Sequence, residues 1–362
     1  MKTREILAAI AAAAMAVTAT ACASSTTSSN ISAVADESST ASDAGTASTA
    51  EAASTAEASD NTENTENTDS DKVYTVGICQ LVQHDALDAA TKGFKDVLTE
   101  KLGDNVKFDE QNANGEATNC TTICTGFAAS GVDLILANAT GALQAASAAT
   151  ATIPILGTSV TDYATALSID DWTGATGTNI SGTSDLAPID EQANMLVEMF
   201  PDAKQVGILY CSAEANSKYQ ATKFGEALTA AGVAYKEYSA ADTNEISAVV
   251  TTAISECDVL YIPTDNTMAS STETIKNIVV PAKIPVIAGE EGICAGCGVA
   301  TLSISYEDLG RATGEMAYEV LVNGADISTM EVRFAPNVTK KYNADICAEL
   351  GITPPEGYVA IG

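Results

Sequence analysis

The sequence predicts an α/β protein of two similar lobes, each a Rossmann-like parallel sheet with helices on both faces. Strand-like and helix-like segments alternate from about residue 72 onward, and the alternation restarts after about 130 residues. Short apolar runs separated by helices are typical of parallel sheets. The length of 362 residues also leaves room for about two domains.

In the first half, apolar runs of strand length alternate with segments whose apolar residues recur at helical spacing. We expect strands at residues 73–82, 105–113, 132–139 and 153–160. We expect helices between them at residues 85–103, 116–131 and 142–150.

The second half repeats this order in three matching blocks. The block "VGICQLV" with its later "ATKGF" is matched by "VGILYCS" with "ATKFG". The block "GVDLILANATGALQAAS" is matched by "ECDVLYIPTDNTMASST", and "TIPILGTSVTD" by "KIPVIAGEEGI". A repeat this long, in constant order, indicates two related α/β lobes.

The N-terminus precedes both lobes. Residues 1–22 have a basic start, an apolar run and small residues before Cys22, as in a lipoprotein signal peptide. We therefore expect Cys22 to carry a lipid that anchors the protein to a bacterial membrane. Residues 23–71 are rich in Ser, Thr, Ala and acids, a composition that predicts a disordered tether.

Charge and motifs exclude several functions. The formal net charge of -31 disfavours nucleic acid as a partner. The chain has one histidine and no Walker, GxSxG or GxGxxG motif, so we expect neither an enzyme nor a cofactor. Eight cysteines remain besides Cys22, in pairs such as "CTTIC" and "CAGC". Zinc, disulfides and free buried thiols are all open, with free thiols favoured and no metal expected.

The repeat also predicts where a ligand binds. In open parallel sheets, ligands bind beyond the carboxyl ends of the strands, so the polar residues that follow corresponding strands should face a shared cleft. These candidates are Asn138, Thr140, Gly141, Thr158 and Ser159 in the first lobe. Their counterparts in the second lobe are Asp265, Asn266 and Glu290.

The two sets differ in charge. The first lobe offers hydroxyl, amide and backbone N–H groups, which suit a carboxylate. The second offers Asp265 and Glu290, which suit an ammonium group. Donors on one wall and acids on the other predict a zwitterionic amino acid as ligand. The alternative is that Asp265 and Thr140 only cap their helices.

Loops after the first strand of each lobe add further candidates, because they should overhang the cleft. The candidate contacts are Gln80 and His84 in the first lobe, and Glu214 and Asn216 in the second. Obvious aromatic stacking partners are scarce, and we consider Tyr210, Tyr261 and Tyr306 for that role.

From about residue 73 onward the chain resembles substrate-binding lipoproteins of ABC transporters, of the tryptophan/tyrosine type. The resemblance rests on segments that include "HDALDAATKGFKDVL", "EQNANGEATN", "NISGTSD", "YIPTDNT" and "SISYEDLGRATGEMA". It implies a periplasmic-binding-protein-like fold, with a hinge of crossing strands between the lobes. It also implies an extracytoplasmic monomer that delivers an aromatic or hydrophobic amino acid to a permease and an ATPase in separate chains.

On that fold the chain crosses between lobes near residues 178–184 and 301–303, and again after "EVRFAP". We therefore assign residues 73–181 and 302–362 to lobe 1, and residues 182–301 to lobe 2. The helix "ISYEDLGRATGEMAYEVL" would complete lobe 1 and bring Tyr306 near the mouth of the cleft. Alternatives are a receptor for a sugar, a nucleoside or a branched-chain amino acid, or a surface adhesin or sensor.

Overall fold

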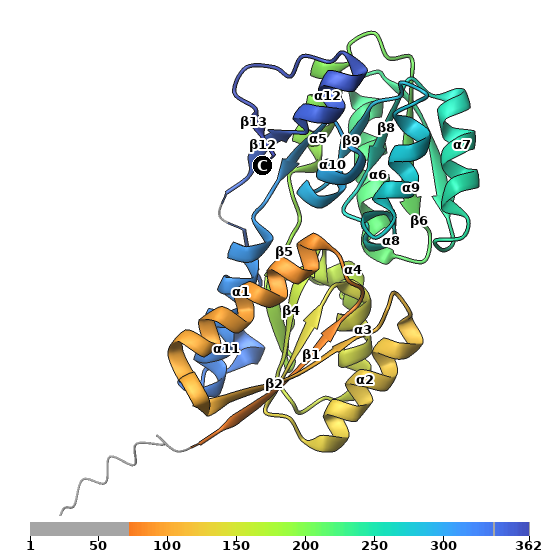
Figure 1. The fold of residues 1–362 in the computed structure, drawn as a ribbon. Coiled ribbons are helices and arrows are strands. Elements are labelled where there is room, and N and C mark those ends of the chain that lie inside the picture. The colour runs from red at the N-terminus through yellow and green to blue at the C-terminus, as the bar shows by residue number, and fades with distance from the viewer. Residues whose placement is uncertain (1–71, 336, 362) are drawn as a thin grey trace, which may run out of the picture. The chain divides into compact units, whose positions relative to one another are not determined.

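Two sheets organise the computed structural model, which describes residues 72–335 and 337–361 (Figure 1). The first has six strands, and all of its strand pairs are parallel. In sheet order they are β11 (Arg333–Phe334), β5 (Ile180–Ser184), β4 (Ile155–Val160), β3 (Leu134–Asn138), β1 (Tyr74–Gln80) and β2 (Val106–Asn112).

Helices cover both faces of this first sheet, which we call lobe 1. On one face, α1 (Asp85–Leu102) packs along α11 (Tyr306–Leu321), and on the other α2 (Ala117–Ser130) packs on α3 (Thr140–Ala149). The shorter helices are α4 (Tyr163–Leu167), η1 (Gly103–Asn105) and η2 (Ile327–Thr329). The strands are buried from both sides, which explains why they read as continuous apolar runs.

The second sheet has seven strands and forms lobe 2. In sheet order they are β13 (Val359–Ala360), β12 (Thr339–Tyr342), β10 (Ala300–Ser303), β9 (Val286–Ala288), β8 (Val259–Ile262), β6 (Gln205–Cys211) and β7 (Ala234–Ala240). The β10–β12 pair is antiparallel and the other pairs are parallel. The two-lobed α/β fold predicted from the repeat is confirmed.

The helices of lobe 2 pack in two groups. Helix α5 (Ile189–Met199) packs on α6 (Ala215–Ala230), while α9 (Thr272–Val279) contacts both α7 (Ile246–Glu256) and α10 (Glu291–Cys297). Helix α8 (Asn266–Ala269) follows β8, and α12 (Ala344–Leu350) follows β12.

The chain passes between the lobes three times, after β5, after β10 and after β11. The lobe boundaries expected from the sequence need two corrections. Strand β5 runs to Ser184 in the first sheet, so the first crossing comes after residue 184 and not at 181.

The assignment of the C-terminal residues 339–362 to lobe 1 was also wrong. Strand β12 pairs with β10 in the second sheet, and Ile346 and Cys347 of α12 are buried in the core of lobe 2. The chain has therefore returned to lobe 2 by β12. A helix pattern alone does not reveal on which sheet the helix packs.

The signal peptide, Cys22 and the tether predicted at 23–71 lie outside the described residues. Within residues 72–335 and 337–361, no helix is long and apolar enough to span a membrane. All eight cysteines of the body are free and buried, and the described chain holds no cluster suited to a metal ion. Free thiols are thus what the structure shows among the three alternatives.

Candidate ligand-binding site

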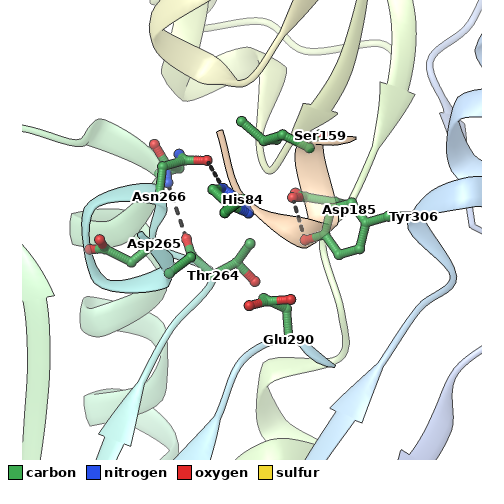
Figure 2. A pocket seen from close by; sticks show the side chains of 11 residues that line it. His84, Ser159, Asp185, Thr264, Asp265, Asn266, Glu290 and Tyr306 are labelled. Atoms are coloured by element: carbon green, nitrogen blue, oxygen red, sulfur yellow. Dashed lines mark hydrogen bonds between the residues drawn. The ribbon is translucent and has the colours of Figure 1, made fainter. Parts of the chain in front are cut away.

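A small cavity lies between the lobes at the carboxyl ends of the strands (Figure 2). Its volume is about 10 Å³, enough for about one water molecule. It is lined by residues from both lobes and from two of the crossings: His84, Leu87, Ser159, Asp185, Asn216, Thr264, Asp265, Asn266, Ala269, Glu290 and Tyr306. None of these lining residues is a lysine or an arginine.

Strand pairing brings the acidic residues of lobe 2 together. Ile262 of β8 lies opposite Ala288 of β9, so the residues that follow the two strands are neighbours. Gly289 makes the close approach possible, because a Cβ there would lie 2.5 Å from the backbone nitrogen of Thr264. Asp265 and Glu290 therefore both reach the cavity, as the repeat predicted.

Asp265 is also a structural cap. One carboxylate oxygen accepts from the backbone N–H of Met268 at 2.8 Å and caps α8. The other accepts from the backbone N–H of Cys211 at 2.6 Å and ties α8 to β6. Both oxygens are thus occupied, so capping is the role that the structure shows for Asp265.

Glu290 also combines two roles, because it caps a helix and lines the cavity. Its side chain lines the cavity and accepts from the backbone N–H groups of Gly292, at 2.6 Å, and Ile293, which caps α10. The side chain is almost completely buried, at 2% exposure. Its charge therefore has backbone dipoles for support and, among the described residues, no cationic side chain beside it.

Asp185 is the main residue that sequence reasoning missed. It follows β5 in the first crossing, and its Oδ2 accepts from the hydroxyl of Tyr306 at 3.0 Å (Figure 2). Its Oδ1 is buried and accepts no hydrogen bond of good geometry from the described residues, although the nearby Thr161 side chain helps to lower the pKa of the carboxyl. The rule that identified Asp265, a polar residue after a buried strand, would have identified Asp185 had the crossing been placed correctly.

Burial raises the pKa of all three cavity carboxyls. Desolvation is the largest cause in each case, and it raises the pKa of Asp185 to about 6, of Glu290 to about 7 and of Asp265 to about 8. For Asp265 the nearby charge of Glu214 adds to the effect. The cavity therefore contains negative charge that is costly without a positive partner.

These shifts predict that the ligand-free protein becomes less stable between pH 6.5 and 8. Carboxyls with a raised folded-state pKa bind more protons in the folded than in the unfolded protein there, so the free energy of unfolding falls with rising pH. The pKa of His84 lies below its usual 6.5, so the histidine adds little in this window. Urea unfolding at several pH values measures how the free energy of unfolding changes with pH, and Glu290→Gln should make this change smaller. A free energy of unfolding that stays constant or rises from pH 6.5 to 8 would contradict the raised pKa values of these carboxyls.

Ser159 provides a hydroxyl on the lobe 1 side. It is the next-to-last residue of β4, within the register shift between Gly157 and Val160, and has a φ of 54°, a left-handed conformation that a serine adopts rarely. Its Oγ is buried, lines the cavity and has no partner among the described residues. A strained residue with a free polar atom at a cleft is typical of a binding site.

His84 connects the lobes across the cavity. Its Nε2 lies 3.2 Å from Oδ1 of Asn266 (Figure 2). The amide of Asn266 donates in turn to Glu214 at 2.6 Å. Glu214 also accepts from the backbone N–H groups of Asn266 and Thr267, so it holds the start of α8 in place.

Six of the predicted site residues do not line this cavity: Gln80, Asn138, Thr140, Gly141, Thr158 and Glu214. Gln80 and Asn138 instead bind Thr91 of α1, which fixes that helix against β1 and β3. Thr158 accepts from Thr183 inside the sheet, and Gly141 packs on Leu81. The Thr140 hydroxyl is buried and has no partner within the part of the chain that the structure describes, but it does not line the cavity.

Two of the three tyrosines considered for stacking are core residues. Tyr261 stacks on Phe224 with ring centroids 3.5 Å apart, and its hydroxyl donates to Gln192. Tyr210 donates to Glu237. Only Tyr306 lines the cavity, where the imidazole of His84 is the other ring.

Comparison with known proteins places this geometry in a family. The family model described as ABC transporter substrate binding protein matches residues 75–360. A tyrosine-binding protein of Clostridioides difficile is 38% identical over 256 residues, which cover 70% of this chain and 74% of that protein.

Two solved structures share the fold and a substantial part of the sequence. The ABC domain from Streptococcus pneumoniae in complex with L-Trp is 33% identical, with a TM-score of 0.76 over 80% of this chain and all of that one. The ligand-free, open structure of a substrate-binding protein with adhesive properties from Clostridium difficile is 38% identical, with a TM-score of 0.62 over 80% of this chain and 99% of that one.

The TM-score is thus higher for the tryptophan complex than for the open structure, although the sequence is more similar to the latter. The family model spans both lobes, since it matches residues 75–360. This chain belongs to the family of ABC transporter substrate-binding proteins.

Proposed function

We propose that this protein binds an α-amino acid with an aromatic side chain between its lobes and delivers it to an ABC importer. The observation that carries the proposal is Asp185, a buried carboxylate with one unpaired oxygen facing a cavity that two further acids line. With no lysine or arginine among the lining residues, the ligand is the natural source of positive charge.

The cavity suits both ends of a zwitterion. Asp185 accepts from the ligand's ammonium group, with Glu290 close by on the other lobe. The unpaired hydroxyl of Ser159 donates to the carboxylate. Leu87 and Ala269 add apolar surface beside these groups. Closure of the lobes would exclude water and strengthen each of these polar contacts.

Binding requires movement, because a cavity of about 10 Å³ does not admit an amino acid. The lobes are joined by three crossings and, across the cleft, by hydrogen bonds that include His84 to Asn266 and Gln220 to Thr161. Breaking these contacts and rotating about the crossings would open the cleft, and a ligand that contacts both lobes would favour the closed arrangement.

The aromatic class is supported by relatives rather than by stacking partners in the cavity. One relative is described as tyrosine-binding and one similar structure contains L-Trp. We further propose that the protein is an extracytoplasmic monomer anchored through a lipid on Cys22, which lies outside the described residues. The permease and the ATPase that complete the importer are separate chains.

Differential scanning fluorimetry of the purified full chain tests the ligand class. A ligand that binds only the folded protein raises the melting temperature as its concentration rises. At 100 times its Kd, the ligand adds about 2.7 kcal/mol to the free energy of unfolding. We expect a shift with tyrosine, tryptophan or phenylalanine at near-neutral pH, after partial unfolding and refolding to remove any retained ligand.

Sugars, nucleosides and the remaining amino acids serve as controls in the same screen. The amides and decarboxylated amines of the aromatic amino acids keep the ammonium group and lack the carboxylate, so they test whether the protein also recognises the carboxylate. A shift with a sugar and none with any amino acid would overturn the proposal.

A further inference from the structure

The hydrogen bonds around His84 determine which of its nitrogens carries the proton. The Nδ2 of Asn266 donates to Glu214 at 2.6 Å, and a carboxylate can only accept. This orients the amide so that its Oδ1 faces Nε2 of His84 at 3.2 Å. Since Oδ1 is an acceptor, Nε2 must be the donor and carry the hydrogen.

The other ring nitrogen is then an unpaired acceptor. In neutral imidazole with hydrogen on Nε2, Nδ1 carries a lone pair. This atom is buried and has no partner among the described residues. Burial lowers the pKa of His84, against the opposing effects of Asn266 and of the charges of Glu214, Asp88 and Asp85, so the ring is neutral at pH 7.

His84 also borders a second, larger pocket. It lines both the inner cavity and an adjoining outer chamber of about 370 Å³. Apart from His84, only Ala269 is shared between the two. Small residues make up much of the outer chamber, where Ala269, Ser270, Gly292, Ala295 and Gly296 leave room for a ring.

A ligand held by its ammonium group at Asp185 would extend past His84 as its side chain leaves the inner cavity. We propose that Nδ1 of His84 accepts a hydrogen bond from a donor on the ligand's aromatic side chain. The site thereby selects amino acids with a side-chain O–H or N–H, such as tyrosine or tryptophan, over phenylalanine. This inference rests on the proposed amino-acid function and adds the group that sets its specificity.

The expected discrimination follows from the cost of an unpaired buried acceptor. Phenylalanine fills the same space as tyrosine and leaves Nδ1 without a donor, so it should bind roughly tenfold or more weakly. A site that recognised only the size and apolar area of the ring would bind phenylalanine more tightly than tyrosine, or bind the two equally.

Isothermal titration of the full chain with L-Tyr, L-Trp and L-Phe at about pH 7.5 measures the preference. In His84→Phe, which keeps a ring and removes the acceptor, the ratio of the Kd values for phenylalanine and tyrosine should fall toward one. Ser159→Ala is the matched control, because losing a contact to the shared carboxylate weakens all three ligands and leaves their ratio unchanged.

Asn266 acts through His84 as a positioning residue. In Asn266→Leu, Nε2 loses its acceptor and the proton is free to move to Nδ1, so the same ratio should fall although the imidazole remains. In the wild type the ratio should also fall at pH values below the pKa of His84, where Nδ1 becomes a donor. It should be independent of pH in His84→Phe, since the other acids of the cavity act on both ligands alike.

The outcomes separate the two proposals. If no amino acid binds the wild type, the proposed function fails and with it this inference. If amino acids bind but the wild type does not prefer tyrosine to phenylalanine, the role of His84 is wrong and the proposed function stands. The same conclusion follows if His84→Phe keeps the wild-type ratio and pH profile.

Discussion

Asp185→Asn should weaken amino-acid binding by roughly 100-fold, because it removes the charge that pairs with the ligand's ammonium group inside a buried cavity. Asparagine keeps the shape of the side chain, and its carbonyl oxygen can still accept from the hydroxyl of Tyr306, now 3.0 Å from Asp185. The loss therefore reports on charge and not on packing. Isothermal titration at about pH 7.5 measures it.

The same variant should be at least as stable as the wild type without ligand. Burial raises the pKa of Asp185 to about 6, so its charge at pH 7.5 costs folding free energy that asparagine does not. Asp190→Asn is the matched control, since Asp190 is exposed on α5 only five positions later. Binding of Asp185→Asn within about threefold of the wild type would refute the assigned role, and lost binding with lost stability would indicate misfolding instead.

Gly310→Ala should destabilise the protein by about 3 kcal/mol through overpacking. Helices α1 and α11 approach so closely that a Cβ on Gly310 would lie 2.0 Å from the carbonyl oxygen of Ala90. Gly93 and Gly314 lie in the same seam, where a Cβ would meet the backbone oxygens of Glu307 and Phe94 at 2.2 and 2.9 Å. Backbone cannot rotate away as a side chain can, so the helices must separate.

Urea unfolding measures this cost, with Gly126→Ala as control. Gly126 lies within α2, and a Cβ there would meet nothing within 4 Å, so alanine should stabilise by up to about 1 kcal/mol through helix propensity. Because α11 begins at Tyr306, the helix shift in Gly310→Ala should also weaken ligand binding. A cost below about 1 kcal/mol would show that the seam can relax.

The candidate site was partly predictable from the sequence, because part of it is formed by residues that directly follow buried parallel strands. Asp265 and Glu290 follow buried strands of a recognisable repeat, and parallel pairing brings them to one edge. Asp185 obeys the same rule, but the crossing was placed at residue 181, before the end of the strand that Asp185 follows. The roles of Glu214 and Asn138 could not be predicted, because each binds an element distant in sequence.

By itself the sequence determined the alternation of strands and helices, the duplication of the lobes and the sheet edge to which Asp265 and Glu290 are brought. These depend on periodicity and on the geometry of parallel sheets, which are properties of short segments and their order. Only the tertiary structure decided that β12 pairs with β10, that Tyr261 is a core residue, and that Asp185 and His84 line the cavity, each with a buried atom that has no partner among the described residues. The hydrogen-bond partner of a buried group depends on which distant segments pack around it, and no local pattern records that.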